Sequence, residues 1–133
     1  MTYRAAILTG FAVFFANALS LAFGWYKVVS QIDIPLHLAG GFAVGMLALA
    51  ILSDLRQRKK LSAAPRWFDY VFTVAFVTFV AVLWEFHEFL LDHTLVWLNH
   101  FAKSQISMTD TMDDLLNGMI GGTVAFFCFY RRK

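Results

Sequence analysis

Residues 70–92 read YVFTVAFVTFVAVLWEFHEFLLD, an apolar run of the length that crosses a bilayer as a helix. The run carries no charged side chain until its last third, where Glu85, His87 and Glu88 stand close together. An ionisable group inside a membrane span is costly and normally faces the interior of a helix bundle, where it has a partner. The stretch therefore predicts both a membrane-spanning helix and a polar site near one end of that helix.

The composition also indicates a membrane protein. Hydrophobic residues make up 59% of the 133-residue chain and charged residues 15%, against about 45–50% and 25% in soluble domains. A soluble fold this small could not cover so much apolar surface with so few polar side chains. The single cysteine, Cys128, excludes an intramolecular disulfide and fits no cysteine metal motif. We expect one all-α integral membrane domain over residues 1–133.

Four apolar runs are each close to the ~20 residues that a helix needs to cross ~30 Å of hydrocarbon. The expected spans of this four-helix transmembrane bundle are Ala5–Tyr26, Ile34–Ser53, Tyr70–Leu91 and Met112–Tyr130. Ala16-Asn17-Ala18 resembles a signal-peptide cleavage site, but the apolar run continues past it, so we interpret the run as a span. Leu95–Phe101, between the third and fourth spans, is apolar enough to lie in the membrane interface as a short helix.

Basic residues concentrate on one side of the predicted bundle. Nine of the eleven Lys and Arg side chains lie at the N-terminus, in the second connection or at the C-terminus, and only Lys27 and Lys103 lie opposite. Such an excess is typical of cytoplasmic segments, so we expect a bacterial cytoplasmic (inner) membrane protein with both termini in the cytoplasm. The nine are Arg4, Arg56, Arg58, Lys59, Lys60, Arg66, Arg131, Arg132 and Lys133.

Most of the acidic residues and all of the histidines then lie on or near the outer side. Any acid–base or metal chemistry is therefore expected at the outer face. The residues concerned are Asp33, Glu85, Glu88, Asp92, Asp110, Asp113 and Asp114, with His37, His87, His93 and His100.

The aspartates before the fourth span have a structural explanation. Carboxylates in a first helical turn accept hydrogen bonds from free N–H groups and favour the helix dipole. Asp110 with Asp113, or Thr111 with Asp114, would form such a cap. Three aspartates within five positions exceed what a cap requires, so at least one of them is expected to have another role.

Asp33 and three of the histidines also have structural interpretations. Asp33 stands just before Ile34-Pro35, a typical N-terminal cap followed by proline in the first turn. His93 and His100 lie in the outer connection and are expected at the headgroup level. His87 points about 200° round its helix from Glu85 and is expected to face lipid headgroups.

Glu85 and Glu88 lack a structural explanation of this kind. They lie near the C-terminal end of the third span, where the helix dipole disfavours negative charge. Their i,i+3 spacing places both on one face, and Asp92 continues that face one turn further out. We therefore interpret Glu85 and Glu88 as functional, and as the catalytic pair if the protein is an enzyme.

Glycine patterns predict how the second and fourth spans meet. Small-xxx-small patterns let helix backbones approach closely in lipid, and these two spans run in the same direction. One stripe is His37, Gly41 and Gly45; the other is Asp114, Gly118 and Gly122, with Asp113, Asn117 and Gly121 adjacent. Packing on the glycines would set His37 level with the aspartates, and the third span would deliver its two glutamates to a similar depth.

The predicted site can neutralise its charge in two ways. Three or more carboxylates cannot all stay ionised in a low dielectric without a cation or shared protons. One solution is a divalent metal, and a single imidazole among oxygen ligands suits Mn, Fe, Zn or Mg. The other is a set of protonated carboxylates that serve acid–base catalysis or a proton relay. The predicted metal ligands are His37, Glu85, Glu88, Asp110, Asp113 and Asp114, with Asn117 in support.

Three motifs carry a resemblance to known families. HLAGGF (residues 37–42), WEFHEFLLD (residues 84–92) and DTMDDLLNGMIGG (residues 110–122) resemble the small bacterial membrane proteins of the YjdF-like family. DLLNGMIG (residues 114–121) also resembles the VanZ-like proteins, which are associated with glycopeptide resistance and the cell envelope. The resemblance implies a membrane fold with a site at His37, Glu85, Glu88, Asp110 and Asp113 or Asp114. It implies no particular reaction, because neither family has a firmly assigned one.

Two classes of function remain open at this stage. An enzyme would act on a lipid headgroup or an envelope precursor, with the metal polarising a phosphoryl or acyl oxygen. A non-enzyme would be a proton or cation carrier, which at this size would need a homo-oligomer to line a path, or an accessory subunit whose polar cluster fastens its helices. An apolar wall beside the acidic cluster favours the enzyme, whereas a polar track toward the cytoplasm favours transport. The expected partner is the lipid bilayer, and no nucleic acid is expected.

Overall fold

The fold was obtained as a computed structural model, which describes residues 3–29, 31–96 and 107–130. All regular secondary structure in these ranges is helical. The elements are α1 (Tyr3–Ala22), α2 (Trp25–Val28), α3 (Asp33–Gln57), α4 (Arg66–Leu91), the π-helical turn η1 (Asp92–Val96) and α6 (Met108–Phe129).

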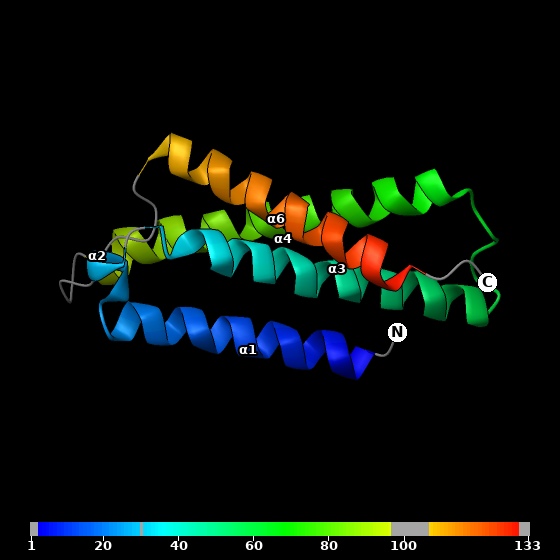
Figure 1. Ribbon diagram of the computed structural model, residues 1–133, viewed down its shortest axis with the longest axis horizontal. Coiled ribbons are helices and arrows are strands. Elements are labelled where there is room, and N and C mark those ends of the chain that lie inside the picture. Colours follow the sequence, from blue (N-terminus) through cyan, green and yellow to red (C-terminus); the bar gives the residue numbers. More distant parts are fainter. Residues whose placement is uncertain (1–2, 30, 97–106, 131–133) are drawn as a thin grey trace.

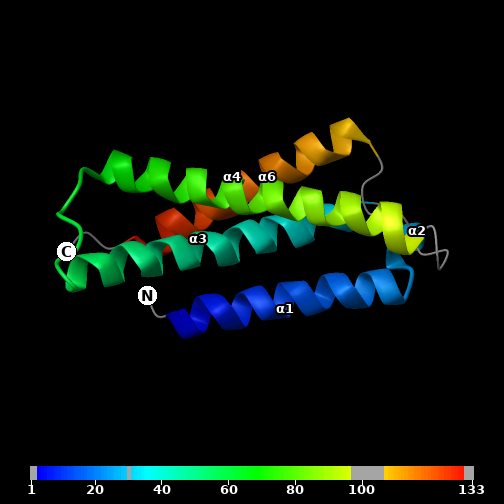
Figure 2. The ribbon, with the colours of Figure 1, turned by 180° about the vertical axis from the view of Figure 1, so that it is seen from behind.

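The long helices lie side by side along one axis (Figure 1). Helices α3 and α6 run in the same direction and α1 and α4 run in the opposite one, so the two ends of the chain lie at the same end of the bundle (Figure 1, Figure 2). Helix α3 is central, because it packs against α1, α4 and α6. The predicted parallel arrangement of the second and fourth apolar segments is therefore confirmed.

Three of the predicted spans are confirmed as helices long and apolar enough to cross a membrane. These are Tyr3–Ala22, Asp33–Gln57 and the α4–η1 segment Arg66–Thr94, with mean hydropathies of 1.9, 1.9 and 1.8. Helix α6 has 22 residues but is not among them, since its first turns carry aspartates. The fourth span therefore stays a prediction. So does the interfacial helix at 95–101, most of which lies outside the described residues.

The first span is shorter than the sequence predicted. Helix α1 ends at Ala22, whereas the apolar run continues to Tyr26. Gly24 has φ +69°, a left-handed conformation that ends a helix and that glycine adopts without a Cβ penalty. The short helix α2 follows and carries Tyr26 in a new direction. Hydropathy could not reveal this break, because the turn itself is apolar.

Both predicted N-terminal caps are wrong. Helix α6 is capped by Ser107, whose side chain accepts a hydrogen bond from the Asp110 backbone N–H at 3.1 Å. Helix α3 begins at Asp33 itself, which is buried, while Ile32 occupies the cap position without a side-chain bond. Ser107, which lies outside the predicted span, therefore caps α6 in place of an aspartate. Asp33 does not cap α3, so its buried carboxylate can take part in a site.

The glycine packing of α3 against α6 is confirmed. A Cβ built on Gly41 would lie 2.7 Å from the Gly118 Cα, and one on Gly45 would lie 2.9 Å from the Ala125 Cβ. Gly121 faces the α3 backbone just as closely, since its Cβ would lie 2.8 Å from the Phe42 nitrogen. These contacts leave no room for a side chain, so they fix the helix register.

The end of the bundle that holds the termini is closed by a partly buried ion pair between Arg56 and Asp69. Arg56 donates to both carboxylate oxygens of Asp69, at 2.8 and 2.6 Å, and the Tyr130 hydroxyl donates to Asp69 Oδ2 at 2.9 Å. Asp69 is fully buried. This network joins α3, α4 and the end of α6. We call this end the basic end, and the end with His37, Glu85 and Glu88 the acidic end.

Candidate metal centre

His37, Glu85 and Glu88 form a compact group of potential ligands at the acidic end. Each offers one donor atom, and these atoms all lie within 4.8 Å of one another. All three side chains are buried, with exposures of 9%, 6% and 2%. Helix α3 provides the imidazole just after its first turn, and α4 provides both carboxylates one turn apart near its end. The sequence predicted this meeting, and the structure brings the three residues together.

Asp114 joins the group from α6. Its Oδ2 lies 3.7 Å from His37 Nε2, and the side chain is only 4% exposed. A separation of 3.7 Å is too long for a hydrogen bond, yet it suits an ion pair when the imidazole is protonated. The contact follows from the glycine packing, because Asp114 and His37 each precede a close-contact glycine by four residues.

Asp33 also belongs to the cluster, although its sequence context favoured a helix cap. It lies one helical turn before His37 and is buried, and its Oδ1 has no hydrogen-bond partner among the described residues. Its charge acts on both Glu88 and Asp114. The i,i+4 spacing from His37 was the available signal, but the neighbouring proline favoured the cap interpretation.

Trp84 positions one of the candidate ligands. Its indole N–H donates to Glu88 Oε1 at 3.0 Å, an i,i+4 contact along α4. Trp84 was not predicted as a site residue, although its i,i+4 spacing from Glu88 is visible in the sequence. An indole N–H is a donor only, so this bond holds the Glu88 carboxylate through one lone pair of Oε1.

Tyr26 on α2 lies near the cluster, where its hydroxyl interacts with the charges of Asp33, Glu88 and Asp114. Its hydroxyl donates to Asn17 Oδ1 on α1. Burial raises the pKa of the Tyr26 hydroxyl above its ordinary value, and the charges of Asp33, Glu88 and Asp114 raise it further. The hydroxyl therefore stays protonated and donates hydrogen bonds. Its position depends on the turn at Gly24, and hydropathy does not reveal that turn.

The other predicted site residues lie outside the compact group. Asp110 is half-buried in the first turn of α6, where its charge acts on both His37 and Asp114. Asp113 is exposed, and Asn117 is half-buried further along α6. The remaining histidines are peripheral or undescribed: His87 and His93 are exposed, and His100 lies outside the described residues.

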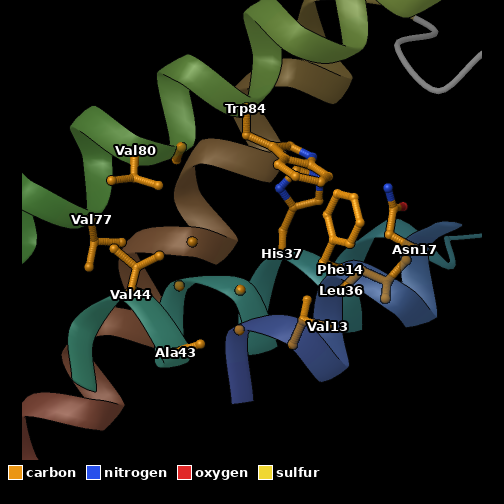
Figure 3. A pocket seen from close by; sticks show the side chains of 15 residues that line it. Val13, Phe14, Asn17, Leu36, His37, Ala43, Val44, Val77, Val80 and Trp84 are labelled. Atoms are coloured by element: carbon orange, nitrogen blue, oxygen red, sulfur yellow. The ribbon is translucent and has the colours of Figure 1, made fainter. Parts of the chain in front are cut away.

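A mostly apolar cavity of about 300 Å³ lies against the cluster. It is bounded by α1, α3 and α4, and His37 and Trp84 stand together in its wall near Phe14 and Asn17 (Figure 3). Valine, leucine and alanine side chains and glycines line the rest of the cavity, and Gly118 adds a contact from α6. The imidazole of His37 therefore belongs to both the polar cluster and the wall of an apolar cavity.

The electrostatics of the cluster require a compensating charge. Among the described residues, the cluster holds four buried carboxylates, from Asp33, Glu85, Glu88 and Asp114, and one buried imidazole, from His37. Desolvation and mutual repulsion both oppose their full ionisation. Bound protons or a cation must therefore accompany them, and a carboxylate/imidazole set of this kind can hold a divalent metal or exchange protons.

The chain belongs to a family described as a predicted membrane protein (DUF2238), which it matches over residues 3–133. No curated protein and no solved structure matches the chain. Family membership agrees with the composition and with the apolar helices, so the prediction of a membrane protein is confirmed. The family description names no reaction and no ligand.

Proposed function

We propose that this membrane protein binds a divalent metal ion through His37, Glu85 and Glu88 and uses it to act on a lipid headgroup or a cell-envelope precursor. One observation carries the proposal: the donor atoms of these three side chains lie within 4.8 Å of one another in a buried site. The proposed ion is Mn, Fe, Zn or Mg.

The geometry suits a single ion after side-chain adjustments. Ligand atoms bonded at about 2.1 Å lie about 3.4 Å apart around a tetrahedral ion. The donor atoms of the three side chains lie within 4.8 Å of one another, so side-chain shifts of up to about 1 Å would complete the site. One nitrogen and several oxygens form the donor set that these metals accept, and no thiolate is present to favour a softer ion.

Neighbouring residues would tune the ion. Asp114 lies beside His37 Nε2 and can orient the ring or serve as a further ligand. Trp84 holds Glu88 through its indole N–H. In a bound state the metal would act as a Lewis acid on a phosphoryl or acyl oxygen, and Glu85 or Glu88 would accept or deliver protons where it does not ligate.

The proposed membrane orientation places the site in the outer leaflet of the bacterial cytoplasmic membrane. The basic residues of the α3–α4 connection and of both termini support a cytoplasmic basic end. The resemblance to YjdF-like and VanZ-like proteins is consistent with a role at the cell envelope. The role at the cell envelope is part of the proposal.

The alternative is a proton or cation carrier, or a subunit whose polar cluster is purely structural. A carrier needs a polar route from the cluster to the basic end. The fully or nearly fully buried side chains along this part of the described bundle are instead mainly apolar, among them Ala43, Met46, Val77 and Ala125. The apolar cavity beside His37 also favours a lipid-directed role.

Elemental analysis of the purified protein tests metal binding. We expect a stoichiometric metal in the wild type and its loss in His37→Ala and in Glu88→Gln. Matched controls are His87→Ala, which removes an exposed imidazole of α4, and Asp54→Asn, which removes a carboxylate paired with Arg58.

A metal-free wild-type protein with an intact helical fold would overturn the proposal. So would metal retained in both site variants. Loss of metal in the control variants as well would indicate unspecific binding.

A further inference from the structure

The cavity beside His37 is a groove between α1 and α4, with α3 as its floor. Val13 and Phe14 come from α1, Val44 from α3, and Val77 and Val80 from α4 (Figure 3). All three helices are membrane-spanning by length and composition. The medium that the groove meets is therefore lipid.

Two glycines, Gly10 on α1 and Gly40 on α3, leave the space that forms the groove. A Cβ on Gly10 would meet nothing within 4 Å, and one on Gly40 would meet only Val13, at 3.9 Å. Helix α1 packs mainly on α3 rather than on α4. At the acidic end, the Phe14 and Trp84 rings meet edge to face with centroids 6.4 Å apart and bridge the two helices.

The groove has a direction. Its lining extends from Gly10 to Asn17 along α1 and from Val77 to Trp84 along α4. Each stretch has eight residues, which span about 10 Å along the helix axis. This is roughly a third of the ~30 Å hydrocarbon core. The polar groups, Asn17, His37 and Trp84, lie at the acidic end, and the other end is apolar.

The membrane setting favours one occupant. The cavity lies among three helices that are long and apolar enough to cross a membrane, and its lining is almost entirely apolar. Lipid acyl chains are the apolar molecules that surround such helices in the hydrocarbon core.

We propose that the groove binds one acyl chain of a membrane lipid, with the lipid headgroup held at His37 beside the metal site. A polar end followed by an apolar channel parallel to the helix axes matches the way a lipid of one leaflet lies in a bilayer. The inference rests on the proposed function for the headgroup end only, whereas the acyl-chain subsite rests on the groove itself.

Photolabelling tests the subsite. The full-length protein is placed in vesicles of phosphatidylethanolamine and phosphatidylglycerol that contain a phosphatidylethanolamine with a diazirine in the middle of one acyl chain. After illumination, mass spectrometry locates the label. We expect labels to concentrate on groove residues such as Val13, Val77 and Val80, above the level on the exposed α1 residues Leu8, Phe11 and Phe15.

Two variants fill the groove from different helices. Gly10→Phe and Gly40→Leu should each lower groove labelling several-fold, since the added side chains project into the open space. Ala12→Phe adds the same ring to an exposed position of α1 and should leave groove labelling unchanged. Circular dichroism of each sample verifies the helical fold, and the labelling pattern of the wild type requires no variant at all.

Uniform labelling around α1 in the wild type would overturn the inference. Groove labelling that persists in both folded groove-filling variants would overturn it too, as would protein–protein cross-links at the groove residues in place of lipid. The metal content of the same samples separates the two claims: a metal-free protein with a labelled groove would refute the proposed function and keep the acyl-chain subsite.

Discussion

Glu88 shows, at the scale of a single residue, how much a membrane sequence reveals about a site. It stands at the dipole-disfavoured end of a helix, where a structural role is hard to justify, and it is 2% exposed beside Glu85 and His37. Asp33 shows the opposite case, because an ordinary cap explained its position in the sequence. Site residues could be recognised from the sequence where no local structural role, such as a helix cap, explained their presence.

The Trp84→Phe substitution tests whether the hydrogen bond from Trp84 holds Glu88 in position for metal binding. The substitution keeps an apolar ring in the groove wall but removes the N–H that donates to Glu88 Oε1 at 3.0 Å. Loss of such a supporting bond typically weakens metal affinity about 10- to 100-fold. A metal titration of the apo protein measures the effect, with Trp67→Phe, an exposed tryptophan at the start of α4, as the control. Equal affinity in the two variants would remove Trp84 from the site.

At the scale of the elements, the register of α3 against α6 was predictable and the helix ends were not. Glycines at i and i+4 mark the face on which two helices approach, and the backbone contact of Gly41 with Gly118 follows from that pattern. The break at Gly24 and the cap at Ser107 depend on individual backbone angles and hydrogen bonds. Hydropathy does not encode these details, so Tyr26 could not be assigned to the site.

Two adjacent glycines of α3 give a matched test of this packing. Gly41→Ala places a Cβ 2.7 Å from the Gly118 Cα, so the helices must separate. Overpacking of this kind costs about 1–3 kcal/mol. Gly40→Ala meets only Val13 at 3.9 Å, so it should be neutral or stabilise the protein by up to about 1 kcal/mol through helix propensity.

Unfolding in mixed detergent micelles, followed by circular dichroism, compares the free energies of the two alanine variants. Because Gly41 also sets the depth of His37 relative to Asp114, the Gly41 variant should lose metal as well. Equal stability of the two variants would contradict the close-packing account of the α3–α6 pair.

For the whole molecule, the sequence predicted a helical membrane protein with opposite chemistry at its two ends, and the structure has this arrangement. At the basic end, Arg56 and Asp69 satisfy each other's charges through two hydrogen bonds, and Tyr130 adds a third. Among the buried side chains that the structure describes at the acidic end, four carboxylates accompany one imidazole. At the basic end, the charges of Arg56 and Asp69 cancel and the pair links the helices. The carboxylates at the acidic end require protons or a cation instead. This contrast between the two ends is the reason to place function at the acidic end.

The most direct test of a metal at the acidic end is an anomalous-scattering map of the crystallised protein grown with Zn²⁺ or Mn²⁺. We expect one strong anomalous peak within bonding distance, about 2.0–2.2 Å, of donor atoms from His37, Glu85 and Glu88. Crystals of Glu88→Gln should lack that peak and keep the helical bundle. A wild-type map in which the ion lies elsewhere, or in which the three side chains contact only one another and water, would contradict the central claim.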